Sequence, residues 1–282
     1  MKDSKGIILT TYHKQFPVLK ESFILPLHVG RASSDITKDG SLSTDEKAWM
    51  VKTMAGDDTG YNISDRNREF SECTGLYWFW KNFQYSNLEY VGVFQYRRQL
   101  ILNDLFERSE ADREKRIYKC VHLDKNEDIC GLAGISEAKI LEILNRYDYI
   151  LPYPTELQHL NIRSAYEDYV KLIPGVHITD LFILEELYQK LYPGTADKLK
   201  EYLSSPNKLM YQVFITKPAL FTQYCEWLFD ILFRLDLLVD SSLYSTNGRR
   251  TMGYLAEILY GFYFTKLIPQ EKTFRTGVTY LE

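Results

Sequence analysis

The sequence has no excess of basic residues. Its 34 lysines and arginines face 38 aspartates and glutamates, which gives a formal net charge of -4. Proteins that bind nucleic acids draw much of their affinity from a basic surface that neutralises phosphates, so this balance argues against a nucleic-acid partner. Any cations that serve a function must therefore be clustered locally.

The chain also lacks long apolar runs and paired cysteines. Its first apolar segment, Ile7–Leu9, is far too short for a signal-peptide core or a membrane span. The four cysteines are scattered, without a CxxC pair or a histidine at ligand spacing, so we expect neither a disulfide framework nor a zinc site. These absences predict a cytoplasmic protein. The aromatic content of 15% leaves room for peripheral association with the inner face of the cell membrane.

What the sequence does contain is enough apolar residues for a full core, since 45% of its 282 residues are hydrophobic. Short apolar segments typical of buried strands cover Gly6–Thr11, Pro26–Gly30, Tyr90–Phe94 and Asp148–Pro152. Polar or helical segments separate them. This alternation predicts an α/β fold with a mostly parallel sheet, in which ligands bind beyond the carboxyl ends of the strands.

The second half of the chain has long helical patterns instead. We predict helices over residues 180–192, 195–203, 218–238 and 252–267, and an earlier one over 69–83. Residues 33–47 and 103–126 are polar and predict a surface loop and a solvated helix-and-loop region. The chain should therefore comprise an α/β part over residues 1–155 and a mainly helical part over 156–282, joined in one continuous domain.

The third strand candidate runs directly into Gln95, Tyr96, Arg97 and Arg98. Guanidinium groups bind carboxylates and phosphates through paired hydrogen bonds, so a phosphate-bearing substrate is the first hypothesis. The ordinary alternative is that both arginines pair with acidic side chains of a neighbouring helix. Because side chains alternate along a strand, we expect only one of the two, with a slight preference for Arg97, to face the phosphates.

Several motifs, taken in order, resemble a bacterial family of capsular and exopolysaccharide biosynthesis proteins. That family was long catalogued as a domain of unknown function and is treated as glycosyltransferases related to galactofuranosyltransferases. The motifs are His13-Lys14, Leu27 to Gly30, Gly56 to Ser64, Glu72, Leu76 to Asn82, Tyr96-Arg97-Arg98, Met210 to Ile215, Tyr224 to Phe229, and Arg249 to Glu257. They span nearly the whole chain. The family pattern at the third strand reads His-Tyr-Arg-Arg, and Gln95, which can still donate and accept hydrogen bonds, replaces the histidine.

The resemblance implies a glycosyltransferase-A-like architecture with a Rossmann-type, mostly parallel sheet. Its first part would bind a UDP-sugar, and the largely helical C-terminal part would shape the cleft for the acceptor. Many such enzymes hold a divalent metal through an Asp-x-Asp motif at a central strand end, and the metal offsets the charge of the leaving diphosphate. Here Gln95 to Arg98 occupy that position, so we expect permanent cations in place of a metal and no cofactor.

The candidate donor site gathers polar residues around the predicted strand ends. Its members are Thr10, His13, Lys14, Asp57, Asp58, Asn62, Gln95, Tyr96, Arg97, Arg98, Arg249 and Arg250. Each has an ordinary alternative: Asp57 and Asp58 form turns readily beside glycines, Thr10 suits a strand without a task, and a lone histidine is more often structural than catalytic.

An inverting transfer needs a general base that removes the proton of the acceptor hydroxyl. Asp180, just after His177 at a predicted helix start, is the first candidate, although aspartate there also caps helices. Glu257 is the other candidate, and the sequence does not choose between them. Glu72, a charge among apolar neighbours, would order Arg97 or Arg98.

Two functions from different classes follow. The first is an inverting, metal-independent glycosyltransferase that moves a sugar, with galactofuranose as the candidate, from a UDP-sugar to a lipid-linked glycan in capsule, exopolysaccharide or O-antigen synthesis. The alternative is a non-catalytic binding or assembly protein of the same pathway. A phosphatase or nucleotidyltransferase is a weaker third option, because neither a phosphate-cradling glycine loop nor an ordered carboxylate cluster is present.

Overall fold

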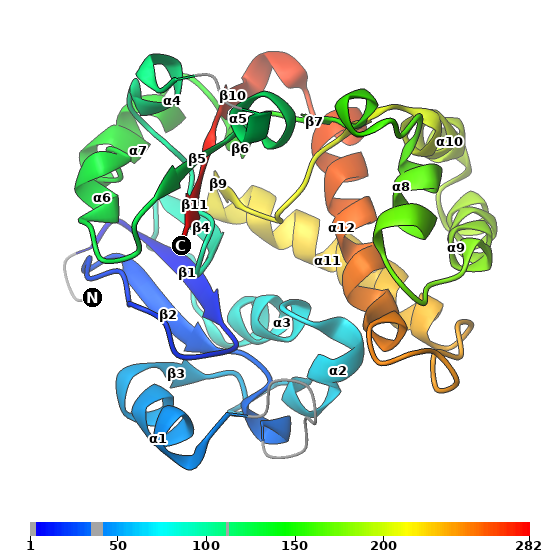
Figure 1. Cartoon of the computed structure of the whole chain (residues 1–282), viewed down its shortest axis with the longest axis horizontal. Helices are drawn as coiled ribbons and strands as arrows, with labels where there is room; N and C mark the ends of the chain where they lie inside the picture. The colour runs from blue at the N-terminus through cyan, green and yellow to red at the C-terminus, as the bar shows by residue number, and fades with distance from the viewer. Residues whose placement is uncertain (1–3, 35–41, 111–112) are drawn as a thin grey trace.

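A seven-stranded mixed sheet lies at the centre of the computed structural model, which describes residues 4–34, 42–110 and 113–282 (Figure 1). The strand order is β10-β6-β9-β4-β1-β2-β3, and only β9 runs antiparallel to its neighbours. The strands are β1 Gly6–Tyr12, β2 Ile24–His28, β3 Ala55–Gly56, β4 Tyr90–Gln95, β6 Tyr149–Pro152, β9 Phe214–Thr216 and β10 Thr273–Thr276. The predicted α/β fold with a mostly parallel sheet is therefore confirmed.

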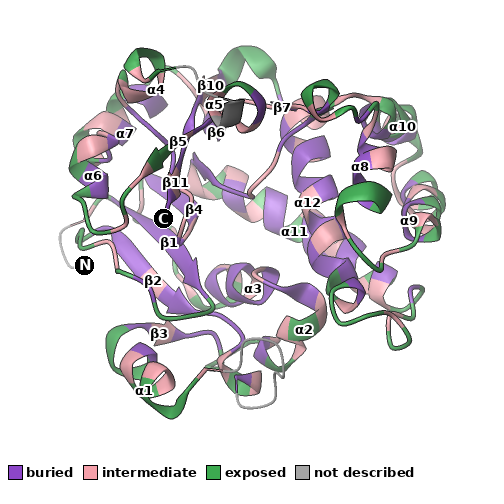
Figure 2. Cartoon of the chain, in the orientation of Figure 1, coloured by how far each residue is buried: buried purple, intermediate pink, exposed green. Residues whose placement is uncertain are grey.

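Both faces of the sheet are buried, as continuous apolar strands predict. In β1, Ile7 and Leu9 pack into one core and Ile8 packs into the other, because successive side chains point to opposite faces. The first core includes α3 (Cys73–Asn82), α11 (Pro218–Asp236) and α12 (Thr251–Phe262), and the second includes α6 (Ile129–Leu132) and α7 (Glu137–Leu144). Figure 2 shows the strands and the inner helix faces buried between these layers.

The C-terminal part is largely helical, as predicted. Its helices are α8 Ala165–Leu172, α9 Ile178–Leu191, α10 Ala196–Ser204, α11 and α12, the last continuing into a π-helical turn over Tyr263–Leu267. However, β9 and β10 also come from beyond residue 156 and join the central sheet. The sheet thus takes strands from both sides of the predicted division. The sequence did not reveal them, because three or four residues carry too little periodicity and their partners are remote in the chain.

Smaller elements surround the sheet. They are α1 Thr44–Thr53, α2 Asn67–Phe70, α4 Leu105–Arg108, α5 Arg113–Tyr118, β5 Cys120–Leu123, β7 Thr155–Glu156, β8 Asn207–Lys208 and β11 Val278–Leu281, with short 3-10 turns such as η2 Ser64–Arg66 and η5 Gly248–Arg250. β11 pairs in parallel with β5, and β7 pairs with β8. The pairing of β11 with β5 brings the C-terminal strand beside the segment over 103–126.

Two predicted segments differ from the structure. The surface loop over 33–47 includes residues 35–41, which lie outside the described part, and its end belongs to α1. That helix begins at a capping box in which Ser43 and Glu46 bond each other's backbone N–H groups. The helix over 69–83 is divided into α2 and α3 because Ser71 has a φ of 51°, outside the helical range. No helix in the described residues is both long and apolar enough to cross a membrane.

Candidate active site

The carboxyl ends of β1 and β4 lie side by side, because these two strands pair in parallel. His13 and Lys14 follow β1 directly, and Tyr96, Arg97 and Arg98 follow β4. This edge is where α/β folds bind ligands. The structure therefore brings two separate sequence motifs of the predicted donor site to one place.

The ring of Tyr96 is the common contact of these residues. It is buried, and the imidazole of His13 meets it edge-on with ring centroids 5.1 Å apart. Lys14 Nζ and Arg97 Cζ each lie 5.8 Å from the ring centroid, close enough for a cation–π attraction. Phe16 supports the ring with a second edge-on contact. Tyr96 thus positions one imidazole and two cations around a single rigid side chain.

Arg97 and Arg98 both contact Tyr280 of β11. Their Cζ atoms lie 5.1 and 3.7 Å from the centroid of that ring. The strand ends at Gln95, and paired backbone hydrogen bonds between Gln95 and Arg98 (2.9 and 3.1 Å) close a tight turn. The alternation expected of an extended strand therefore does not apply to the two arginines, and both guanidiniums share one aromatic support.

Neither guanidinium is paired with an acidic side chain in the part of the chain that the structure describes. Arg97 Nε donates to the Leu281 carbonyl (3.1 Å), and a terminal nitrogen of Arg98 donates to the Arg97 carbonyl (3.3 Å). Arg98 also lies over the ring of Tyr211 (4.8 Å). Carbonyls and aromatic faces hold the two cations in place without cancelling their charge. Such an arrangement attracts an anion.

The pKa of His13 is shifted by burial and by the positive charges at this edge of the sheet. His13 is an exposed residue, and the protein packed around its ring still reduces the hydration of the charged form. Burial, followed by the charges of Arg250, Lys14 and Arg97, lowers the pKa of His13 to about 4. The imidazole is therefore neutral near pH 7 and can accept or donate a hydrogen bond. Arg250, whose Nε donates to Ser71 Oγ (3.0 Å), adds a cation from the helical part.

We use the name strand-end group for six residues that lie together at the carboxyl ends of β1 and β4. They are His13, Lys14, Tyr96, Arg97, Arg98 and Arg250.

Gln95 joins the group to an acidic side chain. Its Nε2 donates to Glu72 Oε1 (3.0 Å). Glu72 therefore holds Gln95, whereas the sequence predicted that it would order Arg97 or Arg98. Burial raises the pKa of Glu72, Arg250 counteracts this shift, and the nearby charge of Glu257 adds to it. The glutamine that replaces the family's histidine thus remains hydrogen-bonded within the site.

Glu257 of α12 belongs to a buried ion cluster beside the strand-end group. Lys208 Nζ lies 2.9 Å from Glu257 Oε1 and 2.7 Å from Asp168 Oδ2. Burial alone would lower the pKa of Lys208, but Glu257 and Asp168 outweigh burial and raise it. The side chain of Glu257 keeps 24% of its surface exposed, whereas that of Asp168 keeps 2%. Of the two predicted general bases, Glu257 is thus an ion-paired carboxylate that still reaches water.

Asp180, the other predicted base, is fully buried at the start of α9. Its carboxylate accepts hydrogen bonds from Tyr244 Oη (2.7 Å), Tyr169 Oη (3.0 Å) and the His177 N–H (3.2 Å). None of these partners belongs to the strand-end group. The arrangement matches the capping role that the sequence offered as the alternative.

Asp57 is also fully buried, and four donors surround its carboxylate. The Gly30 and Arg31 N–H groups donate at 2.8 and 3.1 Å, and the hydroxyls of Ser64 and Thr74 donate at 2.5 and 2.6 Å. These bonds hold the turn after β2, where Gly30 has a φ of 67°. Because these four donors occupy the oxygens of its carboxylate, Asp57 stabilises the fold of this turn.

Asp57→Ala is expected to lower the free energy of unfolding by about 3 kcal/mol or more, because it leaves buried donors without an acceptor. Its neighbour Asp58 is exposed and provides the matched control, with an expected change within about 0.5 kcal/mol for Asp58→Ala. Urea unfolding followed by circular dichroism measures both. Equal stability of the two variants would contradict the structural role of Asp57.

The remaining predicted donor residues lie apart from the strand-end group or face inward. Asn62 is exposed and holds its own turn, bonded to the Gly60 carbonyl (3.0 Å) and the Ser64 N–H (3.2 Å). Arg249 lines a separate recess of about 420 Å³ with Arg66, unlike its neighbour Arg250. Thr10 is fully buried within β1.

A divalent metal does not fit the strand-end group. The position after β4 offers an amide, a phenol and two guanidiniums, which would repel a cation. Among residues 4–34, 42–110 and 113–282, no three His, Cys, Asp or Glu side chains gather as a metal site would require.

Sequence reasoning missed three residues that shape the site: Tyr280, Lys208 and Tyr211. Tyr280 supports both arginines from β11, and Lys208 comes from the short strand β8. The backbone N–H of Tyr211 points to Glu257 Oε2 (3.4 Å), and Tyr211 has an unusual φ of 79°. Tyr211 lies within the Met210 to Ile215 segment that carries the family resemblance and Lys208 lies just before it, whereas Tyr280 had no such signal.

The parallel sheet, its one reversed strand and the helical C-terminal part define an α/β protein, and this fold matches that of a solved glycosyltransferase. A solved structure described as the apo form of the bifunctional glycosyltransferase WbbM matches with a TM-score of 0.83 and 27% identity over 99% of this chain. The chain spans 46% of the length of that solved chain. The chain belongs to the family described as Domain of unknown function (DUF4422), whose model matches residues 7–268. A comparison with curated proteins found no match.

Proposed function

We propose that the protein is a glycosyltransferase that moves a sugar from a UDP-sugar to a glycan acceptor. The observation that carries the proposal is the strand-end group, in which Arg97 and Arg98 have aromatic and carbonyl partners and no carboxylate partner among the described residues. A nucleoside diphosphate leaving group develops negative charge as its bond to the sugar breaks. Fixed cations at that point stabilise the charge without a metal.

In the proposed reaction, the acceptor hydroxyl attacks the anomeric carbon from the side opposite the diphosphate, and the configuration is inverted. The hydroxyl proton passes to the carboxylate of Glu257, the new glycosidic C–O bond forms, and the bond to the UDP oxygen breaks with its electron pair. Lys208 holds the Glu257 carboxylate in place through their 2.9 Å contact. The negative charge of the leaving UDP is stabilised by the four cations of the strand-end group, Lys14, Arg97, Arg98 and Arg250.

The family membership and the similarity to WbbM support a role in polysaccharide synthesis. We further propose galactofuranose as the donor sugar and a lipid-linked glycan of capsule, exopolysaccharide or O-antigen synthesis as the acceptor. The reaction would then take place in the cytoplasm, at the inner face of the cell membrane. The alternative is a non-catalytic assembly protein of the same pathway. The binding of UDP and UDP-sugars distinguishes the two functions.

Isothermal titration calorimetry of the full chain with UDP, UDP-galactopyranose and UDP-galactofuranose tests the donor. We expect saturable binding of UDP that is unchanged by EDTA, because cations of the protein bind the diphosphate. Affinity should fall as the salt concentration rises, since the interaction is largely between charges. Absence of binding across the three ligands would support the assembly protein, and loss of binding in EDTA would contradict the metal-independent site.

A further inference from the structure

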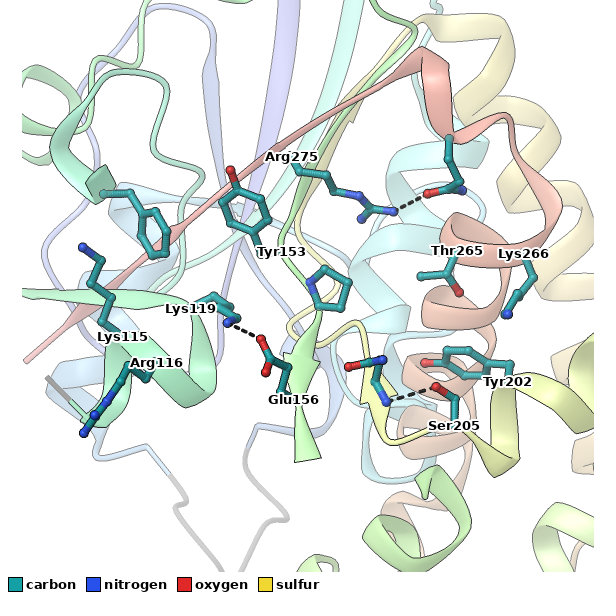
Figure 3. Close-up of a pocket in the computed structure, with 14 residues that line it drawn as sticks. Lys115, Arg116, Lys119, Tyr153, Glu156, Tyr202, Ser205, Thr265, Lys266 and Arg275 are labelled. Atoms are coloured by element: carbon teal, nitrogen blue, oxygen red, sulfur yellow. Dashed lines mark hydrogen bonds and ion pairs between the residues drawn. The ribbon is translucent and has the colours of Figure 1, made fainter. Parts of the chain in front are cut away.

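A cavity of about 750 Å³ lies beside the ends of β6 and β10 (Figure 3). Tyr153 and Pro154, which directly follow β6, line it together with Arg275 of β10. Its volume is that of a small-molecule site. No member of the strand-end group lines it, so it is a second site on the same edge of the sheet.

The lining is strongly basic, although the whole chain carries a formal net charge of -4. One carboxylate, Glu156, faces five cations: Lys115, Arg116, Lys119, Lys266 and Arg275. Figure 3 shows Lys115 and Arg116 on one side and Lys266 on the other, with Arg275 between them. A concave surface lined by one sign of charge concentrates ligands of the opposite sign.

Arg275 is the cation best prepared for an anion. Lys119 is paired with Glu156 (2.6 Å) and Lys266 with Glu201 (2.5 Å). The guanidinium of Arg275 instead donates to neutral acceptors, the carbonyls of Pro152 and Phe264 (3.0 Å each) and Gln270 Oε1 (2.8 Å). No carboxylate in the described residues pairs with it, and burial lowers its pKa. An anion in the cavity would supply the missing counter-charge.

The rest of the lining has the chemistry of a sugar site. Phe106, Tyr153 and Tyr202 present aromatic rings, and Asn207 and Thr265 present an amide and a hydroxyl. Aromatic rings can cover the apolar C–H face of a sugar, while amides and hydroxyls bond its hydroxyl groups. The cavity therefore combines sugar-binding groups with an excess of positive charge.

Tyr211 connects the cavity to the proposed reaction centre. Its hydroxyl donates to the carbonyl of Tyr118 (3.5 Å), the residue before Lys119 of the cavity wall. Its ring lies against Arg98 (4.8 Å), and its N–H points to Glu257 (3.4 Å). Tyr211 thus contacts one proposed diphosphate-binding cation, the proposed base and the backbone beside the cavity.

We propose that this cavity binds the acceptor and that the acceptor is a glycan bearing an anionic group, a carboxylate or a phosphate, held by Arg275. The inference rests on the proposed glycosyltransferase function. It adds the location and the charge of the acceptor. The neighbouring Glu257 would then receive the proton of the hydroxyl that attacks the donor.

Saturation-transfer NMR and calorimetry with D-glucuronate, D-glucose 6-phosphate and D-glucose test the cavity in the full chain saturated with UDP, which keeps the strand-end group occupied. We expect at least one anionic sugar to bind about tenfold more tightly than glucose, and the preferred one assigns the anion as carboxylate or phosphate. Arg275→Gln is expected to weaken that binding about tenfold or more, because it removes a charged donor. Lys198→Gln, at an exposed position of α10 outside the cavity, should change nothing.

Arg116→Gln provides a second variant, because Arg116 is exposed and its replacement is expected to leave the fold intact. It should weaken the binding about twofold to fivefold. Equal affinity for glucose and both anionic sugars, or full affinity in both variants, would overturn the proposal. If UDP itself fails to bind, the glycosyltransferase proposal fails, whereas the contrast between Arg275→Gln and Lys198→Gln still decides the charge of the cavity ligand.

Discussion

Arg97→Gln is expected to lower kcat/KM for transfer from the UDP-sugar by about 100-fold to 1,000-fold, as measured by UDP release in the presence of acceptor. The glutamine keeps hydrogen-bonding capacity and loses the charge that would stabilise the leaving diphosphate. Its effect on folding should be small, because Arg97 is only half-buried and its side chain makes one hydrogen bond within the described residues, to the Leu281 carbonyl. The largest loss should therefore be in catalysis and not in stability.

Two further variants separate this role from a general loss of charge. Arg97→Lys retains a cation without the planar fork and the stacking on Tyr280, so an intermediate loss of about tenfold is expected. Arg108→Gln removes an exposed arginine that pairs with Asp104 of its own turn, and it should leave transfer unchanged. Activity of Arg97→Gln within twofold of the wild-type chain would exclude Arg97 from the donor site.

Glu257→Gln is expected to reduce kcat by about 100-fold to 10,000-fold, the usual effect of removing a general base. Because UDP would bind through the strand-end group, its affinity measured by calorimetry should remain within a few fold. The glutamine can still accept a hydrogen bond from Lys208, so Lys208 loses a charged partner but keeps a hydrogen-bond acceptor at position 257. A loss in kcat without a loss in UDP binding would place Glu257 in the proton transfer.

Asp168→Asn is the matched control, because it removes the other carboxylate partner of Lys208. Asp168 is almost fully buried, so this variant should lose as much stability as Glu257→Gln or more. Its kcat, corrected for the folded fraction in thermal unfolding, should stay close to that of the wild-type chain. Equal losses of kcat in the two variants would show that the cluster acts only through the fold.

The main elements of the fold were predictable because their signals are local. The four strand segments contain continuous apolar runs bounded by polar residues, and β1, β2, β4 and β6 occupy them within a few residues. The long helices repeat their apolar residues at helical spacing over several turns. By contrast, β9 and β10 are short, and their place in the sheet depends on partners far away in the chain.

The candidate site was predictable only in part. His13, Lys14 and the residues from Gln95 to Arg98 follow buried strands, and parallel pairing brings such ends together. Asp57 could not be classified, since the same carboxylate before a helix suits a ligand or a turn. Its four donors come from the turn after β2, from η2 and from α3, and they come together only when those elements are folded.

The sequence by itself therefore determined an α/β fold and two arginines at the end of a buried strand. Tertiary structure decided what those arginines can do. A tight turn and Tyr280 of the C-terminal strand hold both guanidiniums together, where alternation along a strand would have separated them. It also gave Asp180 and Glu257 different surroundings, a buried hydrogen-bonded carboxylate and a partly exposed ion-paired one, because burial and hydrogen bonding depend on neighbours that are distant in sequence. The charge of a side chain follows from the residue type, whereas its partner depends on which distant segments the fold brings beside it.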